Sequence, residues 1–267
     1  MAKRFPIHVV TMGHTGAGKD TFAATFPKPI LIWFFDAFGK DTPYLTEQVI
    51  TPQGEVQWKA AKKVGEMQTY PLGKVVVPYR DIEREDGFVR IEYYHDFEPM
   101  NPNAYALYLT RMGMFHHEQD NWQTVVLSSV TMMEICARKY HQYALNPSTK
   151  DPRQWWGGST DMLEEMLMMR FAGLKMNVVV LAHIDTERDE LFGETVKNPA
   201  GPGRLRGALA TQYAEHYHQF VRRMEDGKLA YLLQSQNDGR FASQTHIQVP
   251  SPSYPHFASL WTAWDKL

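Results

Sequence analysis

Three features are scarce in this chain, and each scarcity excludes a class of protein. A single cysteine, Cys136, excludes an internal disulfide and fits a reducing compartment such as the cytosol. No apolar run approaches the roughly 18 residues that a membrane-spanning helix needs, so we expect no membrane contact. The formal net charge is only −2, so any binding of nucleic acid must come from a local basic patch.

The remaining composition is that of an ordinary soluble protein. Hydrophobic residues make up 43% of the chain and charged residues 22%, values typical of globular domains. A chain of 267 residues is long enough for one large α/β domain or for a core that carries a subdomain. We therefore treat residues 1–267 as a single domain and look for an insertion within it.

The most informative motif lies at residues 13–21, between an apolar run at 7–11 that predicts a buried strand and a segment at 19–25 that predicts a helix. When a strand is followed by a glycine-rich turn and the first residues of a helix, successive backbone N–H groups are directed at one spot. Phosphate-binding loops work in this way. A glycine-rich surface turn with a chance lysine would not need these flanking elements. We expect the loop to bind ATP through Gly13, His14, Thr15, Gly16, Ala17, Gly18, Lys19, Asp20 and Thr21.

Two neighbouring residues of this loop carry most of its chemistry. Lys19 is expected to place its ammonium on the β- and γ-phosphates. Asp20 stands where such loops usually have Ser or Thr, whose hydroxyl ligates Mg²⁺. Either Asp20 ligates the ion through a carboxylate oxygen, or Thr21 supplies the hydroxyl. Because a carboxylate repels the β-phosphate when no metal is present, we expect nucleotide binding to depend steeply on Mg²⁺.

The rest of the core alternates apolar strands with helices. Buried strands are predicted at 30–35, 124–127 and 177–182, and helices at 129–144 and 160–174, the second capped by Ser159 or Asp161. Asp36 follows the first of these strands. Ligands of open α/β sheets bind at the carboxyl ends of the strands, so Asp36 is a candidate site residue, with a solvated turn aspartate as the alternative.

Residues 46–115 differ from the core because they are rich in aromatic side chains. Short strands at 75–77 and 88–91 flank an Asp-Gly pair and predict a hairpin, and a helix is expected at 103–115. We interpret residues 46–115 as an inserted hairpin and helix subdomain.

Near the C-terminus, a Gly/Pro-rich stretch at 198–207 predicts a mobile loop, and antiparallel strands are expected near 219–223, 229–234 and 246–249. The whole pattern predicts a three-layer α/β P-loop fold with a mostly parallel sheet, a hairpin-containing insertion and antiparallel C-terminal strands.

These pieces in this order resemble the RecA-like phage nucleotide-binding P-loop NTPases, which are related to phage single-strand annealing ATPases. The matching stretches are residues 13–21, 29–44, 125–131 and 178–185, with a looser match at 199–214. Together they cover about half of the chain. Only the phosphate-loop motif is specific by itself. The other stretches support the resemblance because they occur in this order.

The resemblance implies roles for individual residues. Asp36 would lie near the γ-phosphate or its attacking water, and His183 would sense the γ-phosphate, unless it is only a hydrogen-bonded histidine at a strand end. Arg204 and Arg206 would follow the backbone of single-stranded DNA, unless they form a solvated basic face. ATP and Mg²⁺ would be the cofactors, identical subunits would form a ring or filament, and a phage-encoded chain would work in the host cytoplasm.

One departure from the family bears on hydrolysis. The family's second nucleotide motif ends in an aspartate that holds the Mg²⁺ shell, whereas Ser128 stands at that position here. Either Asp20 takes over metal coordination beside Ser128, or hydrolysis is weak. Three functions therefore stay open. We favour a Mg²⁺-dependent ATPase that acts on single-stranded DNA in recombination or replication. The alternatives are a nucleotide-binding scaffold with little hydrolysis and a P-loop nucleotide kinase.

Overall fold

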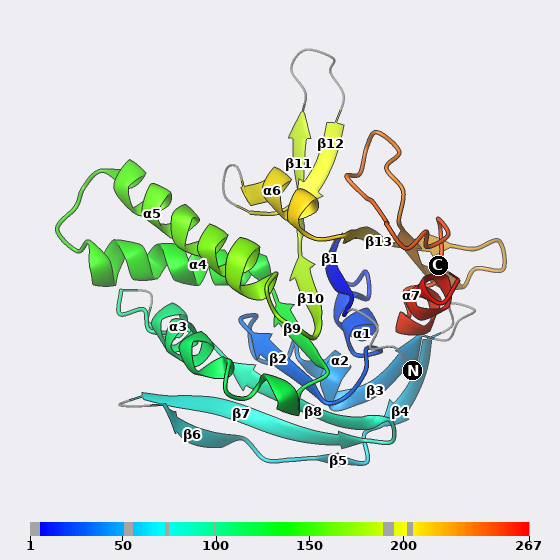
Figure 1. Ribbon diagram of the computed structural model, residues 1–267, viewed down its shortest axis with the longest axis horizontal. Helices are drawn as coiled ribbons and strands as arrows, with labels where there is room; N and C mark the ends of the chain where they lie inside the picture. The colour runs from blue at the N-terminus through cyan, green and yellow to red at the C-terminus, as the bar shows by residue number, and fades with distance from the viewer. Residues whose placement is uncertain are drawn as a thin grey trace.

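A ten-stranded mixed sheet forms the middle layer of the fold (Figure 1). The computed structural model describes residues 6–50, 56–72, 75–98, 100–188, 195–201 and 205–266. The strands of the sheet are β1 (His8–Gly13), β2 (Ile30–Phe34), β5 (Lys63–Val64), β6 (Gln68–Leu72), β7 (Val75–Arg84), β8 (Gly87–Tyr93), β9 (Thr124–Ser128), β10 (Asn177–Ala182), β13 (Glu215–Arg223) and β14 (Leu229–Gln234).

The middle of this sheet is parallel and its two margins are antiparallel. The strand order is β14-β13-β1-β10-β9-β2-β8-β7-β5, with β6 also paired to β7. The six strands from β13 to β8 run parallel, whereas β14, β7, β6 and β5 pair antiparallel with their neighbours. Parallel strands covered on both faces read as continuous apolar runs, and all five residues of β2 are buried. The prediction of a mostly parallel sheet is confirmed.

Helices cover both faces of the sheet, which gives three layers. Alternate side chains of one strand point to opposite faces: Val178 and Val180 of β10 pack into one apolar cluster, and Val179 and Leu181 into the other. The first cluster also takes residues from α3 (Ala104–Phe115), α4 (Val130–Tyr140), α5 (Pro152–Glu164) and α6 (Leu205–Gln212), and the second from α1 (Lys19–Ala23), α2 (Thr42–Leu45) and α7 (Phe257–Trp264).

Shorter elements complete the described chain. They are the hairpin of β3 (Thr46–Ile50) and β4 (Val56–Ala60), the hairpin of β11 (Ile184–Arg188) and β12 (Thr195–Pro199), a 3₁₀ turn at Gln119–Asn121, and π-helical turns at His141–Leu145 and Glu165–Phe171. In the described ranges no helix combines the length and the apolar character needed to cross a membrane.

The aromatic-rich segment joins the central sheet directly. The predicted hairpin is present as β7 and β8, and its turn uses Gly87 at φ +136°, a conformation that suits glycine. β8 then pairs parallel with β2, placing Ile91 beside Ile32. The segment that we interpret as an insertion is therefore continuous with the core through β8.

The predicted start of the second core helix was wrong. α5 begins at Pro152, where Asp151 accepts a hydrogen bond from the Arg153 amide at 3.0 Å, and not at Ser159 or Asp161. Aspartate before proline is a strong start signal, but two glycines inside the helix hid it because glycine is a poor helix former. Gly158 is needed for close packing, since a Cβ there would lie 1.9 Å from His141 Nε2.

Two expectations for the C-terminal half were also wrong. Part of the predicted loop at 198–207 belongs to strand β12, which pairs with β11. Residues 246–249 do not form a strand. The buried carboxylate of Glu215 instead accepts the backbone N–H groups of His246 and Ile247, at 2.9 and 3.2 Å. The apolar pattern of this segment reflects packing against the core, where Ile247 and Val249 are buried.

A buried carboxylate ties α3 to the sheet. Glu92 of β8 is fully buried and accepts hydrogen bonds from Trp33 Nε1 at 3.0 Å, Tyr94 Oη at 2.8 Å and Tyr70 Oη at 2.9 Å. Arg111 of α3 donates to both of its oxygens at 3.1 Å. Four donors therefore compensate the loss of water around this charge.

We expect Glu92→Gln to destabilise the fold by about 3 kcal/mol or more, because it leaves the buried Arg111 charge without its main partner. Urea unfolding measures the change. Glu165→Gln is the matched control, since the Glu165–Arg170 pair is exposed and its loss should change stability by at most about 1 kcal/mol. Equal effects of the two substitutions would contradict the assigned role of Glu92.

Candidate functional site

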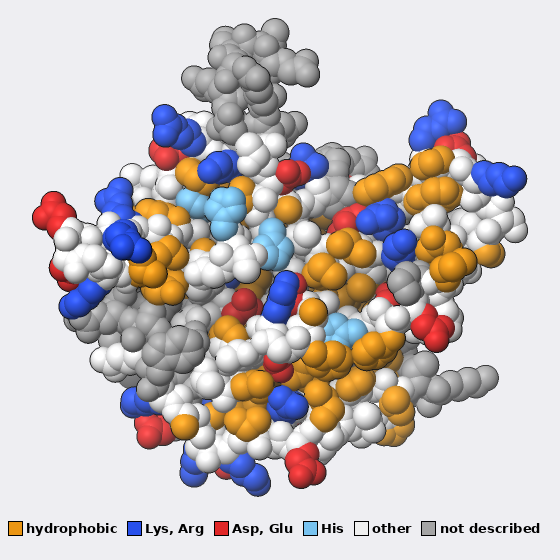
Figure 2. Space-filling view, turned by 180° about the vertical axis from the view of Figure 1, so that it is seen from behind, with side chains coloured by type: hydrophobic (Ala, Val, Ile, Leu, Met, Phe, Trp, Pro, Cys, Tyr) orange, Lys and Arg blue, Asp and Glu red, His pale blue; other side chains and the backbone are white. Residues whose placement is uncertain are grey.

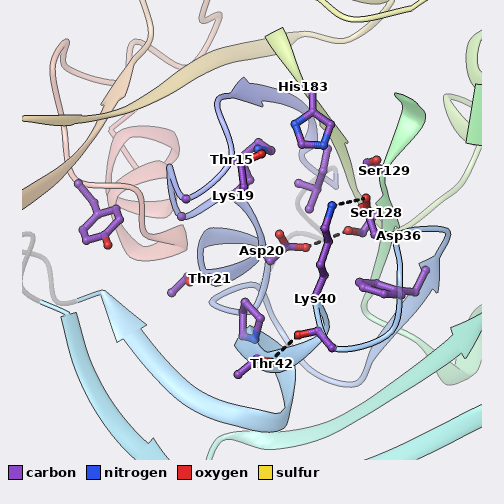
Figure 3. A pocket seen from close by; sticks show the side chains of 17 residues that line it. Thr15, Lys19, Asp20, Thr21, Asp36, Lys40, Thr42, Ser128, Ser129 and His183 are labelled. Carbon is purple, nitrogen blue, oxygen red and sulfur yellow. Dashed lines mark hydrogen bonds and ion pairs between the residues drawn. The ribbon is translucent and has the colours of Figure 1, made fainter. Parts of the chain in front are cut away.

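The carboxyl ends of β1, β10, β9 and β2 border a cavity of about 370 Å³ (Figure 3). It brings together nine residues proposed from the sequence, which come from four separate segments: Thr15, Gly16, Gly18, Lys19, Asp20, Thr21, Asp36, Ser128 and His183. The full lining is Thr15, Gly16, Gly18, Lys19, Asp20, Thr21, Phe34, Asp36, Gly39, Lys40, Thr42, Pro43, Ser128, Ser129, Leu181, His183 and Tyr231.

The glycine-rich loop takes a shape that its glycines permit. Gly16 and Gly18 have φ of +82° and +85°, in the left-handed region that residues with a Cβ rarely adopt. Gly13 lies against β13, where a Cβ would stand 2.7 Å from the carbonyl oxygen of Gln219. The amide of Ala17 donates to the carbonyl of His14 at 3.1 Å and closes the turn. Gly13, His14 and Ala17 thus shape the loop without lining the cavity.

Lys19 supplies the positive charge of the loop. Its ammonium donates to the carbonyl oxygens of Gly13 and His14, at 2.9 and 3.1 Å. Burial lowers the pKa of Lys19, and the charges of Asp20 and Asp36 oppose this shift. α1 has only five residues, so its dipole is small. Attraction of a phosphate therefore rests on Lys19 and on the loop amides more than on the helix dipole.

Asp20 and Ser128 form the central contact of the site. Ser128 Oγ donates to Asp20 Oδ1 at 2.9 Å, and Tyr44 Oη of α2 donates to the same oxygen at 2.9 Å. Burial raises the pKa of Asp20, and both hydrogen bonds and the Lys19 charge oppose this shift. P-loop proteins usually pair a hydroxyl from the loop with a carboxylate from the second motif. This chain has the same pair with the two positions exchanged.

Asp36 and His183 lie across the cavity from the loop (Figure 3). Asp36 is buried, and its Oδ1 accepts no hydrogen bond from any residue in the described ranges. The Lys40 ammonium is 3.8 Å from that oxygen. Burial and the nearby Lys19 charge lower the pKa of His183, which favours the neutral form of its ring. His183 follows β10, which lies beside the loop strand β1.

The oxygen atoms of this cavity fit a magnesium ion that arrives with phosphates. Mg²⁺ in such sites takes one or two carboxylates, phosphate oxygens and water. The cavity wall contains the carboxylate residues Asp20 and Asp36 and the hydroxyl residues Thr21 and Ser128. Asp36 Oδ1 accepts no hydrogen bond from the part of the chain that the structure describes. Among the described residues no group of three or more His, Cys, Asp or Glu could hold a metal alone.

Arg206, one of the two arginines proposed for DNA binding, is not among the described residues that line the cavity. Arg206 donates to the carbonyl of Gly201 at 2.7 Å and pairs with Asp185 at 2.9 Å. Arg204 lies outside the described residues. Three residues at the site, Lys40, Tyr44 and Tyr231, were not predicted from the sequence. Lys40 and Tyr44 lie within the stretch at 29–44, close to Asp36 in the sequence. That closeness could have indicated them as site residues.

Comparison with known proteins adds little to this geometry. No protein-family model and no curated protein matches the sequence. Among solved structures, the chain is similar to a prototypical ATPase from the type III secretion system of pathogenic bacteria, with a TM-score of 0.46 and 10% identity. The match covers 81% of this chain and 52% of that one, so the chain spans about half the length of the ATPase.

Asp20 should make stability depend on pH in a defined direction. Its pKa is raised in the folded protein, so the folded state binds more protons than the unfolded state between the two pKa values. Stability then falls as pH rises from about 4, the unfolded value, to the raised folded value. Asp20→Asn keeps an acceptor for Ser128 and removes the charge. We expect the nucleotide-free variant to be more stable than wild type at pH 7.

Urea unfolding from pH 4 to pH 8 measures this effect. Asp120→Asn, on the exposed turn Gln119–Asn121, is the control and should leave the pH profile unchanged. The assignment fails if Asp20→Asn follows the wild-type profile throughout.

Proposed function

We propose that this chain is a Mg²⁺-dependent P-loop nucleoside triphosphatase that uses ATP. The observation that carries the proposal is the convergence on one cavity of a glycine-rich loop, its lysine, and oxygen ligands from two neighbouring strand ends. Such a site matches the requirements of a triphosphate and its cation, which need several N–H donors, a positive charge and hard oxygen ligands.

In this proposal the loop amides and Lys19 hold the phosphates. Bound Mg²⁺ neutralises charge on the β- and γ-phosphates, and Asp20 and Ser128 would hold it. Asp20 is buried and partly compensated by two hydroxyl donors. The carboxylate is unfavourable beside a phosphate without the ion, which supports a steep Mg²⁺ requirement.

Two further residues support hydrolysis over simple binding. Asp36 has a shielded carboxylate oxygen without a hydrogen-bond donor among the described residues, so it can accept a proton from a water and orient it. The lowered pKa of His183 favours its neutral ring, which can donate one hydrogen bond to a γ-phosphate oxygen. A scaffold that only binds nucleotide would not require either group.

A more specific proposal is that the chain acts on single-stranded DNA, in the manner of the phage proteins that the sequence resembles. Its support lies in β13, where Arg222 and Arg223 are exposed, more than in Arg206, which is already paired with Asp185. Assembly into a ring or filament belongs to the same proposal. A nucleotide kinase is the alternative favoured by a second cavity beside the first, described in the next subsection.

The first test is Mg²⁺-dependent ATP turnover with and without single-stranded DNA. We expect turnover that DNA stimulates, with a stimulation that falls as salt is raised. Lys19→Ala should abolish Mg·ATP binding. His183→Ala should keep binding and slow turnover by about 10²-fold, as for other lost transition-state donors. Tight Mg·ATP binding without turnover would identify a scaffold, and phosphate transfer to a nucleoside monophosphate would identify a kinase.

The exchanged pair gives a second test. Asp20→Ser alone removes the carboxylate and should weaken Mg²⁺ affinity by about 10–100-fold. Ser128→Asp alone places two carboxylates side by side. The double variant restores the usual hydroxyl from the loop and carboxylate from β9, so we expect it to recover Mg·ATP binding that Asp20→Ser loses. A double-mutant cycle measured by calorimetry gives the coupling, and strictly additive losses would contradict metal binding by this pair.

A further inference from the structure

A second cavity, of about 360 Å³, lies on the other side of the segment that follows β2. Asp36, Gly39 and Lys40 line the first cavity, whereas Phe35, Ala37 and Phe38 line the second. Residues 35–40 therefore form a wall of both cavities. The other walls come from residues 95–97, directly after β8, and from α4.

The mouth of this second cavity is aromatic and open to solvent. Phe38 is 49% exposed and Phe97 is 79% exposed, and their rings lie nearly parallel with centroids 6.1 Å apart. The ring of His95 is 4.3 Å from that of Phe38. Figure 2 shows groups of hydrophobic side chains at the surface on the face opposite to that of Figure 1. Large exposed aromatic groups in a cluster usually mark a binding surface.

Polar groups also line this cavity. Asp96 Oδ1 accepts the amides of Asn103 and Ala104 at the start of α3, at 2.6 and 2.8 Å. The Asp96 side chain also hydrogen-bonds to the Cys136 thiol, and His95 hydrogen-bonds to the backbone of Phe35. Neighbouring segments therefore hold the carboxylate and the imidazole in place, and Phe38 and Phe97 remain the large exposed side chains of the lining.

These features indicate the occupant. Two exposed and nearly parallel aromatic rings favour a ligand with a planar ring. Lys139 also lines the cavity, and Lys40 lies in the wall that this cavity shares with the first. A planar ring with an attached phosphate matches both features, because the ring stacks on the aromatic side chains and the lysines attract the phosphate.

We infer that the second cavity binds the base of a second nucleotide unit, stacked on Phe38 and Phe97, beside the proposed triphosphate site. This inference rests on the proposed function, because the shared wall would place that unit next to the bound triphosphate. The same chemistry can come from a free nucleoside monophosphate or from a nucleotide of a DNA single strand. The first source is the acceptor of a kinase, and the second is the DNA of an ATPase.

The test uses full-length protein saturated with Mg²⁺ and a non-hydrolysable ATP analogue, and two fluorescent probes. One probe is 2-aminopurine deoxynucleoside monophosphate, and the other is a short oligodeoxynucleotide strand that carries 2-aminopurine. Stacking on an aromatic side chain quenches either probe. We expect quenching and binding of at least one of them. Phe97→Ala should weaken that binding roughly 5- to 100-fold, the effect of losing one base–aromatic stack, and Phe97→Tyr should restore it.

Controls separate this inference from the proposed function. Met169→Ala removes a side chain that is 70% exposed and lies outside both cavities, and it should leave probe binding unchanged. Quenching of the strand alone supports DNA as the source, and quenching of the monophosphate supports a kinase acceptor. If neither probe is quenched, or if Phe97→Ala behaves like Met169→Ala, the inference is overturned. Failure to bind the ATP analogue itself would instead overturn the proposed function.

Discussion

The hydrogen bond from Ser128 to Asp20 holds the site together. It links the end of β9 to the glycine-rich loop, although β10 lies between β9 and the loop strand β1. Tyr44 adds α2 to the same carboxylate oxygen. One buried acceptor thus fixes the relative positions of the loop, the second strand end and the segment that follows β2. The cavity keeps its shape because these three segments share that contact.

The exchange of carboxylate and hydroxyl leaves one hydrogen-bonded hydroxyl–carboxylate pair in the site, although the two sequence positions are interchanged. A motif search finds two departures from the usual pattern, an aspartate in the loop and a serine at the end of β9. In space they are a single pair with the donor and the acceptor interchanged. The compensation considered from the sequence therefore has a geometric basis, since the two side chains lie within hydrogen-bond distance. Burial of Asp20 makes this pair sensitive to the charge placed next to it.

Much of the fold could be predicted because its signals are local. The loop, the apolar strands and the β7–β8 hairpin each carry their pattern within a few residues. β13 shows where this fails: Glu215, His216 and Gln219 are buried polar residues in its first half, so only its later part was predicted as a strand. The cavity between residues 35–38, 95–97 and α4 could not be predicted either, because its walls come from distant segments and no pattern in the sequence links them.

The position of β8 also determines where the architecture can vary. β8, β7, β6 and β5 extend the sheet from β2 toward one margin, while the loop strand β1 lies three strands away beyond β10 and β9. A change in the length or number of these marginal strands would alter the width of the sheet without shifting the pairing of β1, β10, β9 and β2. The margin beyond β8 is thus a part of the sheet that can accept insertions or deletions while the geometry of the glycine-rich loop is preserved.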